Sequence, residues 1–399
     1  MRYICSCLVM LFVSVSYPDT SRSAKPFFEQ VDVFVSGTEG YRTFRIPSVT
    51  VSNKGTVLAF AESHSLYLND AGDIDIGLRR SFDGGETWGP LQVVWSDGQN
   101  TCGGPTAVVD RDTGRIWLHS RWNHGDDWQP ELQAGIGRDR FRGYALYSDD
   151  DGATWSAPRE ITDSVAHPEW RFLGPGPGVG IQMRLPPYEG RLVIPYMNSS
   201  FGKHVGYDGF KDLHDVHFNS NFGAFVIFSD DHGETWKRSE GVVWPWMNEC
   251  HVVELADGRL MMNMRNFDRR CKCRAVAISE DGGNTWSEAR HVPELVSPIC
   301  QGSFIRYTSE AAHDKNRLLH SNPAHPDRRM NVSVKLSYDE GKTWPVARSI
   351  EPGDSQYSCL TVLQDMKIGI LYERKPYDLI SFARFNLEWL TEGKDQLAE

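Results

Sequence analysis

One arginine attracts notice among the residues able to do chemistry, because its surroundings are apolar. Arg45 lies between Phe44 and Ile46 in the run YRTFRIPSV (41–49), and Pro47 biases the preceding backbone towards extended geometry. A cation in such a strand needs a partner, since an unpaired buried charge is costly. Arg45 is therefore predicted either to form a structural ion pair or to clamp an anionic ligand.

Several common catalytic and cofactor-binding patterns do not occur. The chain has no His-Glu-x-x-His, no Gly-x-Ser-x-Gly elbow and no phosphate-binding Gly-Lys-Ser/Thr loop. The glycine-rich run GPGPGVGIQ (174–182) contains prolines and is better interpreted as a connection between strands. Cys271-x-Cys273 lacks the spacing and the second pair of a zinc site. No metal and no cofactor is predicted.

The charge balance limits the class of partner. The formal net charge is −11 for 399 residues. This disfavours nucleic acid as a ligand, because nucleic acid is also negatively charged. An acidic small substrate requires arginines gathered locally, against the overall sign. The oligomeric state is left open by the sequence.

An eight-residue pattern that occurs five times indicates which elements position these residues. Its frame is Ser-x-Asp-x-Gly-x-Thr-Trp, a combination typical of turns, since Asp accepts backbone N–H groups and Gly allows positive φ. β-rich runs such as GYALYS (143–148) lead directly into it. Five copies cannot all line one site, so their aspartates are predicted to be structural: Asp83, Asp150, Asp231, Asp281 and Asp339.

The spacing of the five copies predicts the fold class. Their aspartates lie 50 to 81 residues apart, and long, uneven repeats of a few strands each favour propeller blades over a helical solenoid. Blades of roughly 40–60 residues divide this length into six or so. We expect one all-β domain over residues 25–399, a six-bladed β-propeller.

The N-terminus differs from the rest. MRYICSCLVMLFVSVS (1–16) has a basic start and a short apolar run, as in a secretory signal peptide. We expect residues 1–24 to be the leader, with cleavage near Ser23 or Ala24, and the mature chain to be secreted, periplasmic or in the lysosomal lumen. An uncleaved membrane anchor is the alternative.

The cysteines outside the leader do not suggest a disulfide scaffold. There are six of them in a large domain, so we expect mostly free or buried thiols with room for one bridge. Asn198 and Asn331 begin Asn-x-Ser patterns, which are glycosylation acceptors only in a eukaryotic host.

With these motifs in view, the chain resembles the exo-sialidase (neuraminidase) family, in its lysosomal-type and bacterial secreted branch. Phe-Arg-Ile-Pro followed by several Asp boxes carries the resemblance, together with SNPAHPDRRMNVSV, CLTVL and LYER. The likeness runs from about Val33 to Tyr372. It implies a six-bladed β-propeller whose site lies at the centre of one face.

The resemblance implies a clamp of three arginines for the sugar carboxylate. Arg45 in FRIP, Arg265 in MNMRN and Arg329 in NPAHPDRR match its members, and the adjacent Arg328 is an alternative to Arg329. A planar guanidinium meets a planar carboxylate with two hydrogen bonds, which suits this role.

The resemblance also implies the reacting groups. Tyr357 in DSQYSCL matches the nucleophile, Glu249 in WMNECHVVEL the glutamate that takes its proton, and Asp70 in LNDAGDID the acid/base, with Asp73 and Asp75 close by. A neutral phenol suits a carbon that carries a carboxylate, because an anionic nucleophile would be repelled. Such a phenol needs a base beside it.

Two further residues complete the implied site. Glu373 in LYER matches the glutamate that holds the first arginine, which would solve the buried-charge problem of Arg45. His64 in FAESH stands where the family usually has an arginine that contacts a sugar hydroxyl. It is either a substrate-binding histidine or an ordinary surface residue.

The sequence thus predicts an exo-α-sialidase that hydrolyses terminal sialic acids of glycoproteins, glycolipids or oligosaccharides with retention. The alternatives are a lectin-like propeller that binds sialylated glycans without turnover, a structural adhesion propeller, and a trans-sialidase. The presence of Tyr357, Glu249 and Asp70 together disfavours a lectin, because binding alone does not need them. Partition between water and a second sugar depends on rim aromatics such as Trp122, Trp128 and Trp246.

Overall fold

Strands make up nearly all of the regular structure. The computed structural model describes residues 25–66, 68–200 and 221–398, so the predicted leader lies outside the described residues. The helices of the described part are short: α1 (Gln129–Ala134), α2 (Thr162–Val165) and α4 (Leu387–Leu390). None of them is long and apolar enough to cross a membrane. The all-β prediction is confirmed.

The strands form curled sheets whose neighbours are almost all antiparallel. The first sheet contains β2 (Thr43–Val51), β3 (Val57–His64), β4 (Ile74–Ser81), β5 (Gln92–Trp95), β6 (Thr101–Val109), β7 (Ile116–Asn123), β8 (Arg142–Ser148), β9 (Arg159–Glu160) and β11 (Gly178–Val179). The second contains β10 (Trp170–Pro175), β12 (Ile181–Gln182), β13 (Leu192–Ser200), β14 (Asn221–Ser229) and β15 (Lys237–Arg238).

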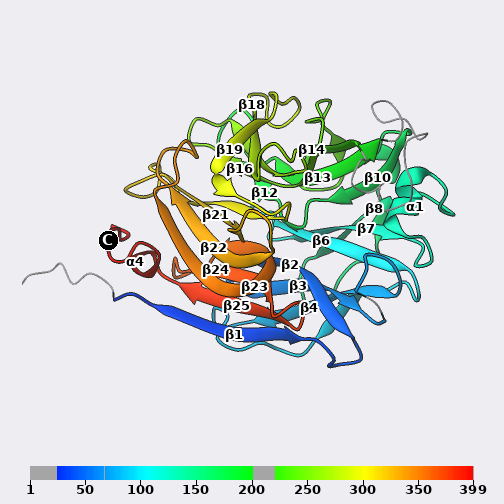
Figure 1. Cartoon of the computed structure of the whole chain (residues 1–399), viewed down its shortest axis with the longest axis horizontal. Helices are drawn as coiled ribbons and strands as arrows, with labels where there is room; N and C mark the ends of the chain where they lie inside the picture. Colours follow the sequence, from blue (N-terminus) through cyan, green and yellow to red (C-terminus); the bar gives the residue numbers. More distant parts are fainter. Residues whose placement is uncertain (1–24, 67, 201–220, 399) are drawn as a thin grey trace, which may run out of the picture.

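The remaining two sheets complete the chain. One contains β16 (Met247–Glu254), β17 (Leu260–Asn266), β18 (Cys273–Ser279) and β19 (Arg290–Val296). The other contains β1 (Phe28–Val35), β20 (Ser303–Thr308), β21 (Arg317–Pro323), β22 (Met330–Ser337), β23 (Val346–Val362), β24 (Ile368–Arg374) and β25 (Leu379–Phe385). Figure 1 shows the sheets following one another around a centre, with the last strand, β25, lying beside the first, β1.

Apolar side chains fill the space between neighbouring sheets. One cluster joins Trp117 of β7 to Tyr196 of β13 and Phe225 of β14. β-branched and aromatic residues fit such pleated, half-buried surfaces, which is why runs like GAFVIFS form strands here. The packed sheets supply a rigid frame for the loops and strand ends that carry polar residues.

The five repeated motifs are turns that follow β4, β8, β14, β18 and β22. At Asp150, the Thr154 amide donates to Oδ1 at 2.8 Å, the Thr154 hydroxyl to Oδ2 at 2.6 Å and the Ser148 hydroxyl to Oδ1 at 2.9 Å. The same bonds recur at the other four aspartates, Asp83, Asp231, Asp281 and Asp339. The carboxylates are thus occupied within their own turns.

Glycines of the turns also pack closely against neighbouring strands, and at Gly85 and Gly233 the contact is with a strand of another sheet. Gly85 has φ +92°, and a Cβ there would lie 2.2 Å from the Phe382 ring of β25. Gly233 has φ +92°, and a Cβ there would lie 2.1 Å from the Trp117 ring of β7. Only glycine meets both the positive φ and the close approach. The repeats therefore connect consecutive sheets as well as turning the chain.

Acid should weaken these turns. The hydrogen bonds from Thr154 and Ser148 hold the pKa of Asp150 at about 2, below its ordinary value of 3.8. A carboxyl whose pKa is depressed by folding stabilises the fold above its ordinary pKa, and this contribution disappears as the pH falls through the folded pKa. We expect Asp150→Asn to lower the melting temperature near neutral pH and to flatten its fall between about pH 4 and pH 2.

Thermal unfolding followed by circular dichroism at closely spaced pH values measures this effect. Asp163→Asn is the matched control, because that carboxylate is 96% exposed and pairs with the surface side chain of Arg140. Melting curves of Asp150→Asn that superimpose on those of the wild type over the whole acid range would contradict the expectation.

The cysteine prediction is confirmed, and the two Asn-x-Ser positions differ in burial. Cys271 and Cys273 form a disulfide, and the free thiols of the described residues are all buried: Cys102, Cys250, Cys300 and Cys359. Asn198 is fully buried in β13, where its strand neighbours cover it, so a glycan cannot be attached to the folded chain there. Asn331 is partly buried, and its side chain accepts a hydrogen bond from Ser349 at 2.7 Å.

Candidate active site

Irregular positions in three ladders carry residues of the candidate site. Arg45 lies at a register shift between β2 and β3, Glu249 at one between β16 and β17, and Tyr357 at one between β23 and β24. A bulge turns a side chain out of the regular alternation, and bulges are frequent beside active sites. Strand periodicity gave no signal for these positions.

Tyr357, Glu249 and Arg265 form a hydrogen-bonded group. The Tyr357 hydroxyl donates to Glu249 Oε1 at 2.5 Å, and Arg265 Nη1 donates to Glu249 Oε2 at 2.7 Å and to the Tyr357 oxygen at 3.1 Å. Tyr357 and Glu249 are buried but not fully enclosed, with 5% and 6% exposure. A phenol therefore touches a carboxylate that can take its proton.

The surroundings of Tyr357 keep its hydroxyl protonated until a base acts on it. Burial raises the pKa of Tyr357 well above its ordinary value, and the neighbouring Glu249 carboxylate raises it further, whereas Arg265 and Arg329 act in the opposite direction. The resting group is thus a neutral phenol donating to a carboxylate. Such a phenol needs the adjacent base in order to become a nucleophile.

Arg45 is held by two carboxylates. Its Nη1 donates to Asp70 Oδ1 at 3.0 Å and to the Leu68 carbonyl at 3.0 Å, and its Nε lies 4.0 Å from Glu373 Oε1. Burial acts to lower the pKa of Arg45, but Asp70 and Glu373 outweigh it and raise that pKa. Both interpretations of Arg45 made from the sequence, a structural ion pair and a clamp for an anionic ligand, are compatible with these contacts.

Glu373 also joins two parts of the site through the backbone. The carboxylate is fully buried and accepts the Ile46 amide at 2.8 Å and the Tyr357 amide at 3.2 Å. Burial raises the pKa of Glu373, against the lowering effect of Arg45. One side chain thus fixes the strand after Arg45 relative to the strand that carries Tyr357.

Arg329, rather than its neighbour Arg328, lies beside Tyr357. Arg329 Cζ lies 5.6 Å from the centre of the Tyr357 ring, and its Nη1 donates to Gln356 Oε1 at 3.3 Å. Arg328 instead is 65% exposed and pairs with Asp354 at 3.4 Å. The structure therefore brings Arg265 and Arg329 together around Tyr357.

Among the three neighbouring aspartates, only Asp70 contacts an arginine of the site. The Asp75 carboxylate accepts the Tyr41 hydroxyl at 2.6 Å. Asp73 lies in the same loop, and burial raises its pKa. Asp70 is 42% exposed beside Arg45, which suits a group that exchanges protons with a ligand and with water.

His64 is buried, so its interpretation as a surface residue is wrong. It is 1% exposed, and its Nε2 lies 3.1 Å from Glu62 Oε2 within the same strand, β3. Strand β3 is covered on both faces, which a single sequence with an alternating polar end does not reveal. The structure places His64 behind Glu62, as a support for that carboxylate.

Sequence reasoning overlooked Arg274, which contacts the backbone of Glu249. Arg274 is fully buried and donates to Asn263 Oδ1 at 2.7 Å and to the Cys300 carbonyl at 2.6 Å, and it lies 3.5 Å from the Glu249 carbonyl. Burial lowers the pKa of Arg274 to about 10. It lies in no motif quoted from the sequence, so only the packing identifies it.

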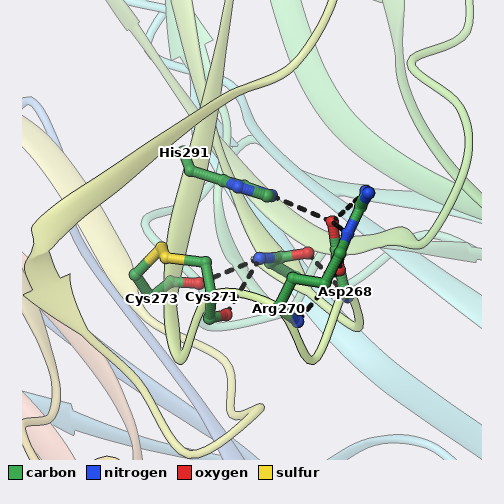
Figure 2. Close-up of a disulfide and its surroundings, with 6 residues drawn as sticks. Asp268, Arg270, Cys271, Cys273 and His291 are labelled. Atoms are coloured by element: carbon green, nitrogen blue, oxygen red, sulfur yellow. Dashed lines mark hydrogen bonds and ion pairs between the residues drawn. A yellow bond between two sulfur atoms is a disulfide. The ribbon is translucent and has the colours of Figure 1, made fainter.

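A disulfide-bonded loop follows Arg265. Cys271, which lies between β17 and β18, is bonded to Cys273, the first residue of β18. The Asn266 side chain donates to both of their carbonyls, at 3.4 Å and 3.3 Å. Figure 2 shows this loop with Asp268 bonded to Arg270 and paired with His291. These bonds fix the loop after β17, the strand that carries Arg265.

The rim aromatics differ in exposure. Trp128 and Trp246 are exposed by 42% and 39%, and Trp246 precedes β16, which carries Glu249. Trp122 instead donates its indole N–H to Asp97 at 2.7 Å. Trp128 and Trp246 thus offer ring faces to solvent.

A group of possible metal ligands lies around Asp110, which directly follows β6. Among the described residues, Asp110, Asp112 and His232 form the one group of at least three such side chains whose ligand atoms lie within 4.8 Å of one another. Asp110 already accepts hydrogen bonds from Thr113 at 2.8 Å and Gln182 at 2.9 Å, and His232 lies 2.8 Å away. The group is interpreted as a hydrogen-bonded turn.

Glu373→Gln should destabilise the fold. It leaves the Arg45 guanidinium buried with one carboxylate instead of two, and removing one partner of a buried pair costs about 3 kcal/mol. We expect a decrease of that size in the free energy of unfolding in urea. Glu86→Gln is the control, since Glu86 is an exposed partner of Arg384. A change no larger than that of the control would contradict the structural role of Glu373.

Comparison with known proteins identifies the type of domain and several similar proteins. Residues 55–371 match the BNR repeat-like domain. A sialidase of Micromonospora viridifaciens is 34% identical over 376 residues, and an exo-alpha-sialidase of Aspergillus fumigatus is 29% identical over 441 residues. The solved structure of a Hadza microbial sialidase superimposes with a TM-score of 0.76 at 33% identity, over 89% of this chain and 68% of that chain.

These matches carry the assignment one step further, to a family. The chain belongs to the sialidase family. The match covers 92% of this chain and 55% of the Micromonospora protein, but 98% of both this chain and the Aspergillus protein. An intramolecular trans-sialidase of Ruminococcus gnavus shares the fold, with a TM-score of 0.72 at 22% identity.

Proposed function

We propose that the chain is an exo-α-sialidase that hydrolyses terminal sialic acids from glycoproteins, glycolipids or oligosaccharides with retention of configuration. The 2.5 Å contact between the Tyr357 hydroxyl and Glu249, beside Arg265 and Arg329, carries the proposal. A phenol paired with a base inside a group of arginines suits attack on a carbon that bears a carboxylate.

Binding begins with the sugar carboxylate. Arg45, Arg265 and Arg329 supply the guanidinium groups that hold it, with charge-assisted hydrogen bonds. In the free chain Asp70 occupies Nη1 of Arg45 at 3.0 Å. The incoming carboxylate competes for that donor and releases Asp70, which takes up a proton from solvent and then faces the departing glycan oxygen as an acid.

The reaction then proceeds in two displacements. Glu249 takes the proton of Tyr357 while the phenolic oxygen bonds to the anomeric carbon, and Asp70 protonates the leaving oxygen. Asp70, now a carboxylate, accepts a proton from water, which attacks the same carbon and releases Tyr357; Glu249 returns the proton to the phenol. Two inversions give overall retention.

Incubation of the purified chain with a fluorogenic aryl sialoside tests the activity, and proton NMR of the first sugar released tests the stereochemistry. We expect the α-anomer to appear before mutarotation. Binding of the sialoside without release would favour the lectin-like alternative, first release of the β-anomer would refute the Tyr357 mechanism, and a sialylated product with added lactose would favour a trans-sialidase.

The architecture and location form part of the same proposal. We infer six blades from six successive groups of strands, each starting near the centre, at β2, β6, β10, β16, β20 and the second half of β23. The sequence of residues 1–24 supports export through a signal peptide, with residues 25–399 as the catalytic domain.

A further inference from the structure

A second arginine occupies, in another group of strands, the position that Arg265 has in its own. Arg265 is the sixth residue of β17, and Arg121 is the sixth residue of β7. Glu62 is the sixth residue of β3, where it lies opposite Arg45 in the β2–β3 ladder. The same end of three strands thus presents Glu62, Arg121 and Arg265.

The guanidinium of Arg121 is buried yet makes few bonds. Arg121 is 6% exposed, close to the exposure of Arg45 and Tyr357. Among the described residues, its hydrogen bonding is limited to donation from Nη1 to Asn123 Oδ1 at 3.0 Å, while Nη2 lies 3.6 Å from Glu62 Oε1. A guanidinium has five N–H donors, and buried donors are normally satisfied. Most of these donors are therefore available to a ligand.

The backbone around Arg121 leaves room for this pair. A Cβ at Gly103 would lie 2.5 Å from Glu62 Oε1 and 3.2 Å from Arg121 Nη2, and one at Gly174 would lie 3.3 Å from Arg121 Cδ. The Gly104 amide donates to Glu62 Oε1 at 2.6 Å. The glycines leave space for the Glu62 carboxylate, and the Gly104 amide holds it beside Arg121, where it acts as the counter-ion.

The charges indicate which kind of ligand fits. Burial acts to raise the pKa of Glu62, but the hydrogen bond to His64 and the charge of Arg121 bring it below its ordinary value, so Glu62 is a carboxylate. A neutralised guanidinium suits an uncharged acceptor oxygen, whereas the carboxylate of the sugar is drawn to the cluster of Arg45, Arg265 and Arg329. His64 faces Glu62 and is in no position to supply that donor itself.

We propose that Arg121 is a substrate-binding residue that donates to an uncharged oxygen of a sugar ring substituent, the C4 hydroxyl or the carbonyl of the C5 acylamido group. It supplies from β7 the guanidinium that His64 does not supply from β3. The proposal rests on the sialidase activity proposed above. Glu62, positioned by His64 and Gly104, orients Arg121 and balances its charge.

Substrate analogues combined with Arg121→Met test this assignment. The parent aryl sialoside, its 4-deoxy analogue and its 5-deamino-5-hydroxy analogue are compared by kcat/KM. We expect Arg121→Met to lower kcat/KM of the parent about 10- to 100-fold, mainly through KM. We expect one analogue to lose almost nothing on mutation, because its oxygen is already absent, and that analogue identifies the group bound.

Two further variants protect the test against misfolding. Arg121→Met combined with Glu62→Gln leaves no unpaired buried carboxylate, and Arg121→Lys keeps the charge without the planar fork. Arg115→Met is the matched control, since Arg115 directly precedes β7 at its opposite end and pairs with Asp149 and Glu234 on the surface. The double variant is expected to show the same substrate pattern, and Arg121→Lys an intermediate loss on the parent.

The outcomes separate this inference from the proposed function. If the wild type cleaves no sialoside, the proposed function fails. If the wild type is active and folded Arg121 variants keep the control's kcat/KM on the parent, or lose the same factor on all three substrates, Arg121 is structural and the inference is overturned.

Discussion

Tyr357→Phe should abolish turnover while leaving inhibitor binding intact. The substitution removes one oxygen, which donates to Glu249 at 2.5 Å, and leaves the ring below Arg329 in place. Loss of a nucleophile costs on the order of 10³-fold or more in kcat. The arginines remain, so the dissociation constant of an unsaturated sialic acid analogue should change little.

Single-turnover kinetics and calorimetry measure the two halves of this expectation. Tyr307→Phe is the matched control, because it also removes a buried hydroxyl, one that donates to the Met366 carbonyl in the turn before β24, at the opposite end of that strand from Glu373. Near-wild-type kcat in Tyr357→Phe would exclude the covalent mechanism. Loss of inhibitor binding together with turnover would instead assign Tyr357 a role in binding.

Asp70→Ala should have effects that depend on the leaving group. A sugar alkoxide needs a proton to depart, whereas a nitrophenolate needs very little help. General acid catalysis contributes about 10²- to 10⁴-fold, so we expect that loss in kcat/KM for sialyllactose and a much smaller one for the aryl sialoside. Asp75→Ala is the control, since Asp75 is bonded to Tyr41.

The same variant also tests the competition at Arg45. Removal of Asp70 frees the Nη1 donor that it occupies at 3.0 Å. The unsaturated analogue, which has a carboxylate and no leaving group, should therefore bind Asp70→Ala at least as tightly as the wild type. Equal losses on both substrates would move the acid role to Asp73, and weaker binding of the analogue would contradict the competition at Arg45.

The fold was more predictable from the sequence than the detailed geometry of the site. Each repeat contains its own turn chemistry, so Asp150 and Thr154 specify a local structure that needs no distant partner. Spacing between such turns indicates sheets of a few strands. The ladder irregularities at Arg45, Glu249 and Tyr357 depend on pairing between strands far apart in sequence, and no local pattern marks them.

Family likeness compensated for this only where a motif existed. It pointed to Arg329 and Glu373, whose contacts then placed them beside Tyr357 and Arg45. It gave no hint of Arg274 or Arg121, because a buried arginine in a strand looks alike in sequence whether it supports a carbonyl or faces a ligand. The interpretation of His64 as a surface residue failed because burial of β3 on both faces is a tertiary property.

The pairing of β1 with β25 constrains the order in which the chain folds. Phe28 lies opposite Phe385, so this ladder joins residues from the two ends of the described chain. The entropy of closing so long a loop must be overcome before any of its hydrogen bonds form, which makes such pairing late and slow. During synthesis, β1 is made long before β25. It therefore has no partner in this ladder until β25 has been made. A chain stripped of residues 28–35 would leave β25 as an open edge, which is a template for pairing between molecules.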